Sequence, residues 1–339
     1  MLKLNALVAG STGYIGVQLI KLLVKHKHIN IKYLCGNTSV GKKISSFERS
    51  LSSKKLPKIV KFDKKYLDHV DVIFTALPNG EAQDISKYLR KNNVLIDLAA
   101  DFRLEKSSEY SKWYKQKHRA VNNIKKSIYS LPEITGNKIK KFNIIGCPGC
   151  YPTSILIPLI PLLKKKLIKI KNIIIDSKSG YSGAGRSVHK KYKNKNLYES
   201  LSAYGVGFHR HNSEIEQELK KYNKNIEFDF TPHLTPMFRG ILSTIYIDLS
   251  KNSSQLKIIK ELKKFYKKCN FIKIQKRDKL ISTNEVINTN YCNISVCKSK
   301  NGSKLVILSS IDNLIKGGAG QAIQNLNIKF NLPETTGIK

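Results

Sequence analysis

The chain has 339 residues, 41% of them hydrophobic, and a formal net charge of +37. This length and apolar content suit two domains, each with its own core. The lysines are spread through nearly every segment and do not cluster among aromatic residues, which favours a solvated surface over a nucleic-acid-binding one. No stretch approaches the length of a membrane-spanning helix. We therefore expect a soluble, cytoplasmic protein that binds neither nucleic acid nor a membrane.

Apolar runs alternate with helical patterns through the first part of the chain. Strands are expected at 2–10, 29–36, 70–78, 94–100 and 141–146, and helices at 14–27 and 81–92. This alternation predicts an α/β fold in which helices flank the parallel sheet of a Rossmann-type domain.

The pattern changes after Pro152, where the apolar runs become longer and alternate with polar residues. We expect helices at 153–167 and 253–268 and strands at 172–179, 226–234, 241–249, 291–297 and 304–312. Such strands suit an α+β domain with a mixed or antiparallel sheet, and a turn at Asn301-Gly302 would join the last two as a hairpin. A glycine turn at 317–320 should open the last helix.

A glycine-rich turn follows the first strand. Gly10 would permit the tight turn, Gly13 would let the backbone approach a pyrophosphate, and Gly16 would let the helix pack on the sheet. The phosphates would bind at the helix N-terminus. The spacing is G-x-x-G-x-x-G, so an ordinary turn is the alternative. The expected cofactor-binding residues of this turn are Gly10, Ser11, Thr12, Gly13, Tyr14, Ile15 and Gly16.

The loop after the second strand carries no acidic residue between positions 35 and 43. A site for NAD usually has a carboxylate here for the ribose 2′-hydroxyl. Asn37, Thr38, Ser39 and Lys42 offer donors and positive charge instead, which favours the 2′-phosphate of NADP. An ordinary polar loop is the alternative.

Cys147 and Cys150 form a C-x-x-C pair that permits three interpretations: a redox dithiol, half of a metal site, or one nucleophile beside a second cysteine. The remaining cysteines form no matching pair, so a metal site has weak support. A helix N-terminus lowers the pKa of a thiol, and Cys150 is expected at the start of a helix. Beside a nicotinamide site, one sulfur suffices for thioester chemistry.

Such chemistry also needs a proton shuttle and groups that bind the substrate's anionic parts. His209 and His211 flank Arg210 just before an expected helix that Asn212 or Ser213 would cap, and Glu214 or Glu216 could orient a histidine ring. His233 lies between prolines. Arg103, Arg186 and Arg239 are candidates for binding a phosphate, although each alone could be a surface residue.

Several motifs together resemble the N-acetyl-γ-glutamyl-phosphate reductases, which reduce an acyl phosphate in arginine biosynthesis. They occur in order from residue 10 to residue 325: GSTGYIG, ALPNG, DLAADFRL, PGCYPTS, SGAGR, HRHNSEIEQ, FTPHLTPMFRGI and DNLIKGGAGQAIQN. The segments PGCYPT and FTPHLTPM are specific to that family, and the glycine motif is shared with aspartate-semialdehyde and glyceraldehyde-3-phosphate dehydrogenases. Ser154 and Cys147 depart from the residues common at those positions.

The resemblance implies a role for each motif. Cys150 would be the nucleophile and His211 the acid/base. Further cofactor contacts would come from Leu77, Pro78, Gly183 and Asn313, and substrate contacts from Arg103, Ser182, Arg186, His209 and Arg239. The cofactor would be NADP, the substrate an acyl phosphate, and the protein a homo-oligomer. Residues 1–148, completed by 312–339, would bind NADP, and residues 149–311 would form the catalytic and dimerisation domain.

Other functions remain open at this point. A related acyl-phosphate or semialdehyde dehydrogenase, such as one for aspartate semialdehyde, shares the glycine motif. A non-catalytic NADP-binding redox sensor could use Cys147 and Cys150 as a dithiol, but it would not need the HRH segment. A nucleic-acid-binding protein should concentrate its charge on one face.

Overall fold

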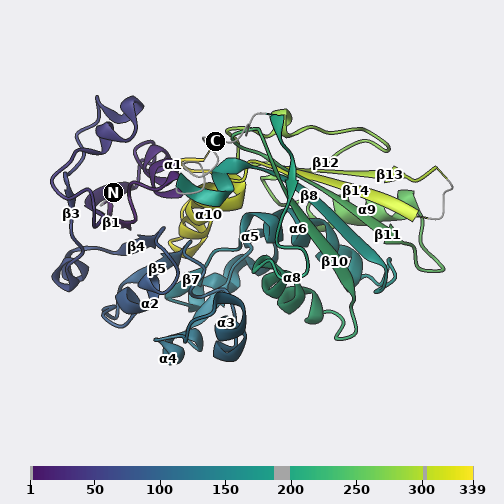
Figure 1. The fold of residues 1–339 in the computed structure, drawn as a ribbon, viewed down its shortest axis with the longest axis horizontal. Coiled ribbons are helices and arrows are strands. Elements are labelled where there is room, and N and C mark those ends of the chain that lie inside the picture. Colours follow the sequence, from purple (N-terminus) through teal and green to yellow (C-terminus); the bar gives the residue numbers. More distant parts are fainter. Residues whose placement is uncertain (1–2, 187–198, 301–303, 339) are drawn as a thin grey trace. The chain divides into compact units, whose positions relative to one another are not determined.

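The computed structural model describes residues 3–186, 199–300 and 304–338 (Figure 1). The chain divides into two compact units, one of Met1–Pro148 with Gly318–Lys339 and one of Gly149–Gly317. Residues 312–317 were expected in the first domain but belong to the second unit. The reason is local bonding: Asp312 Oδ2 accepts the N–H of Asn288 at 2.8 Å, and Asn313 Oδ1 accepts that of Gly240 at 2.7 Å.

The described residues of the first unit form a seven-stranded sheet in the order β3-β2-β1-β4-β5-β7-β6, and every pairing is parallel. Its strands are β1 (Leu4–Ala9), β2 (Ile29–Cys35), β3 (Ile59–Val60), β4 (Val72–Thr75), β5 (Val94–Asp97), β6 (Ser127–Tyr129) and β7 (Ile144–Gly146). The order reverses between β1 and β4, and ligands of such sheets bind at the carboxyl ends of the strands beside that point. The expected Rossmann-type sheet is confirmed.

The first unit also contains six α-helices among its described residues. They are α1 (Tyr14–Leu23), α2 (Glu81–Ser86), α3 (Ser107–Tyr114), α4 (Val121–Ile124), α5 (Pro132–Thr135) and α10 (Gly320–Lys329). Helix α2 was expected to reach residue 92 but ends at Ser86. Asn123 Nδ2 donates to the Ser86 carbonyl at 3.1 Å, and the Arg90 N–H donates to Asn93 Oδ1 at 2.8 Å. In a longer helix the Arg90 N–H would donate to the Ser86 carbonyl, but each of these groups is bonded to an asparagine side chain instead.

The second unit contains a mixed seven-stranded sheet in the order β12-β13-β14-β11-β8-β10-β9 among its described residues. Its strands are β8 (Ile173–Gly180), β9 (Ser202–Ala203), β10 (Phe228–Thr235), β11 (Ile241–Asp248), β12 (Ile272–Ile274), β13 (Cys292–Lys298) and β14 (Lys304–Ile311). Strands β8 and β10 pair in parallel, whereas β11 is antiparallel to both β8 and β14. This confirms the mixed sheet, while the expected turn at Asn301-Gly302 lies outside the described residues.

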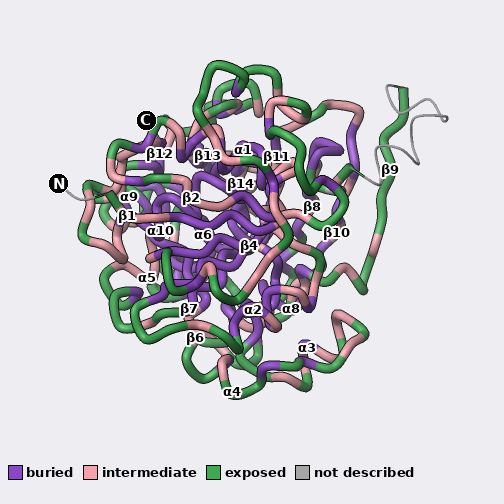
Figure 2. The backbone as a smooth tube through the Cα atoms, turned by 90° about the vertical axis from the view of Figure 1, so that its left-hand side faces the viewer, coloured by how far each residue is buried: buried purple, intermediate pink, exposed green. Residues whose placement is uncertain are grey.

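Within the described residues, the long helices of this unit are α6 (Cys150–Lys164), α8 (His211–Lys220) and α9 (Gln255–Phe265). Helix α6 packs against α8, α9, β11 and β14 and is buried along nearly its whole length, whereas β9 is exposed (Figure 2). Pro161 leaves the Ile157 carbonyl without its helical N–H partner. The Tyr266 hydroxyl donates to that carbonyl at 2.5 Å, so the buried helix tolerates the proline.

The expected glycine turn before the last helix is instead a π-helical turn, η8 (Ile315–Ala319), which runs directly into α10. The Gly317 N–H donates to the Asp312 carbonyl at 3.0 Å, and this bond spans five residues, as in a π-helix. The chain passes from the second unit to the first within this turn.

Candidate active site

Cys150 is the first residue of α6, where the backbone changes from an extended to a helical conformation. Gly149 precedes the helix with φ −66° and ψ 161°, it has no side chain with which to cap the helix, and the first turn contains no acidic residue. The thiol is partly exposed. Because the positive end of the helix dipole favours a thiolate, this position suits a nucleophile.

Cys147 lies in a different environment, within the first unit. It is 1% exposed, and burial raises the pKa of its thiol to about 12. Its Sγ lies 3.5 Å from Asn325 Nδ2, which points an amide donor at the sulfur. A thiol of this kind is not ionised at neutral pH, so the dithiol interpretation loses support and Cys150 is the candidate nucleophile.

His211 lies directly against the turn that carries Cys150. A Cβ atom at Gly149 would come within 2.4 Å of His211 Nε2, which leaves no room for any side chain at position 149. Glu214 accepts the Gly149 N–H at 2.9 Å through Oε2, and its Oε1 lies 3.8 Å from His211 Nε2. Glu214 is fully buried, so α8 places both the histidine and the carboxylate against the turn at Gly149 and Cys150.

The start of α8 differs from the expectation. The helix begins at His211 itself, so neither Asn212 nor Ser213 is its N-cap. The Asn212 N–H donates to the His209 carbonyl at 2.8 Å, and the Ser213 hydroxyl donates back to the Arg210 carbonyl at 2.6 Å, which winds the chain earlier. Of the two acidic candidates, Glu216 binds Lys220 at 2.5 Å on the exposed side, so Glu214 is the one beside His211.

His209 is part of an aromatic cluster around Tyr151, the residue after Cys150. Its ring centroid lies 5.6 Å from that of Tyr151 and 4.7 Å from that of His211. Its Nδ1 accepts the N–H of His211 at 3.2 Å. Burial, and then the charge of Arg210, lower the pKa of His209 to about 4, so its ring is neutral at pH 7. This arrangement fits a neutral ring that supports the turn.

The third histidine has another partner. His233 lies on β10, where its Nδ1 is 2.9 Å from Asp176 Oδ1. Its carbonyl accepts the Tyr151 hydroxyl at 3.1 Å. The His233 backbone, rather than its ring, therefore contacts Tyr151, the residue after Cys150.

Gly317 also lies against Cys150. A Cβ atom at Gly317 would come within 2.6 Å of Cys150 Cβ and 3.0 Å of Cys150 Cα. Glycine is therefore required at both 149 and 317 by contacts with catalytic candidates. Sequence reasoning found neither requirement, because residues 149 and 317 lie far from their partners along the chain.

The other residues expected at the substrate lie in both units. Arg103 is buried in the first unit and donates to the Leu98 carbonyl at 3.2 Å. In the second unit, Arg186 is exposed, and Arg239 binds Asn288 at 2.7 Å and Asp312 at 3.2 Å.

Ser182 and Asn313 are bonded to each other in the second unit. Asn313 donates to the Ser182 hydroxyl at 2.9 Å and accepts the Gly240 N–H at 2.7 Å. The position of a Cβ atom at Gly183 is 3.4 Å from Asn313 Nδ2. The Asn313 side chain thus joins two loops, a structural role beside the cofactor contact expected from the sequence.

The glycine turn of the first unit has the shape expected for a nucleotide site. Gly10 has φ +81°, and a Cβ there would lie 2.2 Å from the Ala76 carbonyl oxygen; a Cβ at Gly16 would lie 2.1 Å from that of Gly10. Gly13 differs, because its φ is −69° and the nearest atom to a Cβ would be 3.7 Å away. Contacts within the protein therefore do not require glycine at position 13, and there is room in front of the N-terminus of α1. The residues therefore fit a dinucleotide.

The other expected cofactor residues of this unit lie around that turn. Leu77 lies beside Gly10, since its Cδ2 would be 3.3 Å from a Cβ at that position, and Pro78 follows it. Asn37 and Thr38 are exposed, whereas Ser39 is 5% exposed.

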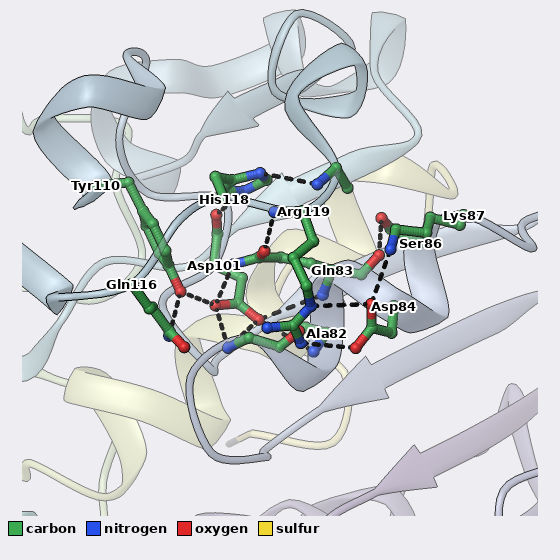
Figure 3. Close-up of polar contacts among 12 residues, drawn as sticks. Ala82, Gln83, Asp84, Ser86, Lys87, Asp101, Tyr110, Gln116, His118 and Arg119 are labelled. Atoms are coloured by element: carbon green, nitrogen blue, oxygen red, sulfur yellow. Dashed lines mark hydrogen bonds and ion pairs between the residues drawn. The ribbon is translucent and has the colours of Figure 1, made fainter.

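Asp101 fixes the loop that continues from Pro78. Its carboxylate accepts the N–H groups of Gly80, Ala82 and Gln83 at the start of α2, and the Tyr110 hydroxyl at 2.7 Å (Figure 3). His118 Nε2 lies 2.9 Å from the Asp101 carbonyl oxygen. The sequence analysis did not identify this residue, although an aspartate after a buried strand was a usable signal.

Comparisons with known proteins agree with this division. Residues 5–142 match the family described as "Semialdehyde dehydrogenase, NAD binding domain", and residues 150–313 match "Semialdehyde dehydrogenase, dimerisation domain". Within the described residues, no helix is long and apolar enough to cross a membrane.

Two curated relatives and one solved structure illustrate the similarity. The chain is 42% identical to an N-acetyl-gamma-glutamyl-phosphate reductase of Ehrlichia ruminantium (strain Gardel), covering 99% of this chain and 97% of the relative. It is 41% identical to a "Probable N-acetyl-gamma-glutamyl-phosphate reductase, chloroplastic" of Arabidopsis thaliana, covering 97% and 82%. Aspartate semialdehyde dehydrogenase II of Vibrio cholerae, solved with ASA, has a TM-score of 0.72 at 16% identity, covering 98% of this chain and 99% of that one. At 16% identity the last comparison shows the fold alone.

Proposed function

Because the chain belongs to the N-acetyl-γ-glutamyl-phosphate reductase family, we propose that it reduces N-acetyl-γ-glutamyl phosphate to N-acetyl-glutamate 5-semialdehyde and phosphate in arginine biosynthesis, with NADPH as cofactor. The family membership confirms what the sequence motifs indicated. The observation that carries the mechanism is the turn at Gly149, against which α8 holds His211 and Glu214 beside Cys150.

Cys150 is the proposed nucleophile. Its thiolate attacks the γ-acyl carbon, a C–S bond forms, and the C–O bond to the phosphoryl group breaks to release phosphate. N–H groups in the first turn of α6 stabilise the oxyanion, although Pro152 contributes none and the Thr153 N–H already donates to the Gly149 carbonyl at 3.0 Å. When bound, NADPH supplies the hydride that reduces the thioester.

His211 is the proposed acid/base. It exchanges a proton with the oxygen of the thiohemiacetal formed on Cys150, and collapse of that intermediate frees the semialdehyde. Glu214 holds the histidine and the Gly149 N–H in one arrangement. His209 stays neutral and supports the His211 backbone.

Binding roles follow the placement of the remaining groups. We assign the cofactor to Gly10 through Gly16, with Asn37, Leu77 and Pro78 beside them. For the substrate's anionic groups we retain the residues named from the sequence: Arg103, Ser182, Arg186, His209 and Arg239. Among the arginines, Arg239 already binds the buried Asp312, so a phosphate would have to share it.

Assembly and location are also proposals. The match of residues 150–313 to a dimerisation domain supports a homo-oligomer, which light scattering of the purified protein would test. All six cysteines are thiols, and a thiol nucleophile works in a reducing compartment, which supports the cytoplasm.

The direct test of the function is the reverse reaction. Purified protein should oxidise N-acetyl-glutamate 5-semialdehyde with NADP, and only when phosphate is present. Activity of similar efficiency with aspartate semialdehyde would transfer the assignment to the related dehydrogenases.

A further inference from the structure

A cavity of about 300 Å³ opens at the carboxyl ends of the strands in the first unit. Residues that follow β1, β2, β3 and β4 line it together with α2. Part of the lining is apolar and includes Phe62, Leu77 and Tyr88, which suits an aromatic base. The cavity contains Gly10, so it adjoins the glycine turn.

Lys61 is the only cationic residue in this lining among the described residues. The two carboxylates of the lining, Glu81 and Asp84, lie on α2, which follows β4. In the sheet, β2 and β1 lie between β3 and β4. Lys61 follows β3, and the two carboxylates follow β4, so the strands that lead to them are three spacings of about 4.8 Å apart. Asp84 is moreover bound to Arg119 at 2.6 Å and Lys87 at 2.9 Å.

The pairing of β2 with β3 fixes where Lys61 lies. Cys35 pairs with Val60, and the Gly36 N–H donates to the Val60 carbonyl at 3.0 Å. Lys61, the residue after Val60, therefore lies beside Gly36 at the carboxyl ends of these two strands. In doubly wound nucleotide sites, the end of the second strand is where an acidic side chain meets the ribose 2′-hydroxyl. Here that position is a glycine, and the neighbouring strand brings a cation.

The loop after β2 was expected to bind the 2′-phosphate, but part of it is hydrogen-bonded to β3. The Gly41 N–H donates to the Ile59 carbonyl at 2.8 Å, and the Ile59 N–H donates to the Lys42 carbonyl at 2.9 Å. Residues 41 and 42 thus extend alongside β3. Of this loop's expected donors, Asn37 lines the cavity, whereas Thr38, Ser39 and Lys42 do not.

We propose that Lys61, assisted by Asn37, binds the ribose 2′-phosphate of the cofactor and sets the preference for NADP over NAD. This inference rests on the proposed function only in that the cofactor is NADP. Lys61 is exposed, so its ammonium can rotate onto a phosphate without distortion of the fold. A charge-assisted contact of this kind corresponds to about a tenfold effect on binding.

The experiment compares two nucleotides by calorimetry on the full chain: adenosine 2′,5′-bisphosphate and adenosine 5′-monophosphate. The wild type and the variants Lys61→Ala, Lys61→Arg, Lys42→Ala and Lys58→Ala are measured. Lys58 is the matched control, because it is exposed and lies before β3 rather than after it. We expect Lys61→Ala to weaken bisphosphate binding about tenfold and to leave monophosphate binding within about twofold. Lys61→Arg should keep most of the preference, and Lys58→Ala all of it.

The outcomes separate the two proposals. If the wild type binds both nucleotides equally, the NADP assignment itself fails. If the wild type prefers the bisphosphate and Lys61→Ala keeps that preference, the role of Lys61 is wrong while NADP stands. Loss of the preference in Lys42→Ala alone would return the site to the loop after β2. Equal melting temperatures of all variants would show that binding, and not folding, has changed.

Discussion

Helices α2 and α6 each follow a glycine whose N–H donates to a buried carboxylate, but the surroundings of their first turns differ. At α2, Asp101 accepts the N–H groups of Gly80, Ala82 and Gln83, so one side chain of the chain itself fills the positive end of the helix. At α6, Glu214 accepts the N–H of Gly149, the residue before Cys150. The first turn of α6 contains no acidic residue, whereas that of α2 contains Glu81 and Asp84. The first arrangement stabilises a loop, and the second places a thiol at the positive end of the helix dipole.

Apart from removal of the proposed nucleophile itself, the largest effect among the variants should come from His211, which lies against the α6 turn. We expect His211→Asn to lower kcat by about 10² to 10⁴-fold, because general acid–base help is lost, while NADP binding barely changes. Pre-steady-state kinetics would separate acylation of Cys150 from the reduction step. The same variants at His209 and His233 are the controls. A crippled His209 or His233 variant beside a near-normal His211 variant would move the role.

Gly317 and Gly13 offer a matched pair of glycines for the second prediction. Gly317→Ala would push a methyl group against Cys150, so iodoacetamide should alkylate Cys150 about tenfold more slowly or worse, since overpacking of this kind costs about 1–3 kcal/mol. Gly13→Ala has room within the protein, so it should leave alkylation and melting temperature unchanged and weaken nucleotide binding. Normal alkylation of Cys150 in Gly317→Ala would contradict this account of position 317.

Asp101 tests the stabilising side of the comparison. Asp101→Asn keeps the shape but removes the charge that accepts several N–H donors, so we expect a loss of about 1–3 kcal/mol in the free energy of unfolding. Urea denaturation measures it, and Asp63→Asn serves as the exposed control that also caps a short helix. Cys150 alkylation should not change. An Asp101 variant as stable as the wild type would mean that the network in Figure 3 is replaceable by water.

The smallest effect concerns His209, whose pKa is lowered to about 4 by burial and Arg210. In the unfolded chain a histidine takes up a proton near pH 6.5, so the unfolded state binds more protons as the pH falls from about 7 towards 4. Stability due to neutral His209 is therefore present above that window and lost within it. His209→Gln, which can still accept the His211 N–H, should show a smaller drop in melting temperature between pH 7.5 and pH 5. An identical drop in both proteins would refute this contribution.

Much of the fold could be predicted from the sequence because its strands are continuous apolar runs, as at Leu4–Ala9 and Val72–Thr75. Element ends were less predictable where distant side chains decide them. Helix α2 stops because Asn93 and Asn123 take its hydrogen bonds, and α8 starts early because Ser213 bonds back to Arg210.

The candidate site divides in the same way. Cys150 and His211 lie in local sequence motifs from which their roles could be predicted, and the glycine spacing identifies Gly10 and Gly16. Gly317 lies against Cys150 only because the chain returns after the whole second unit, and Lys61 lines the cavity beside the glycine turn because it follows β3, a strand of two residues. Contacts of this kind depend on tertiary pairing, which no local pattern encodes.

The measurement that tests the central claim most directly is mass spectrometry of the protein quenched during turnover with N-acetyl-γ-glutamyl phosphate and no reduced cofactor. The wild type and Cys147→Ala should both carry one N-acetyl-glutamyl thioester on Cys150, and Cys150→Ser should carry none, because a serine hydroxyl is a far weaker nucleophile at neutral pH. An acyl group on Cys147, or a Cys147→Ala protein that forms no thioester, would contradict the single-nucleophile account.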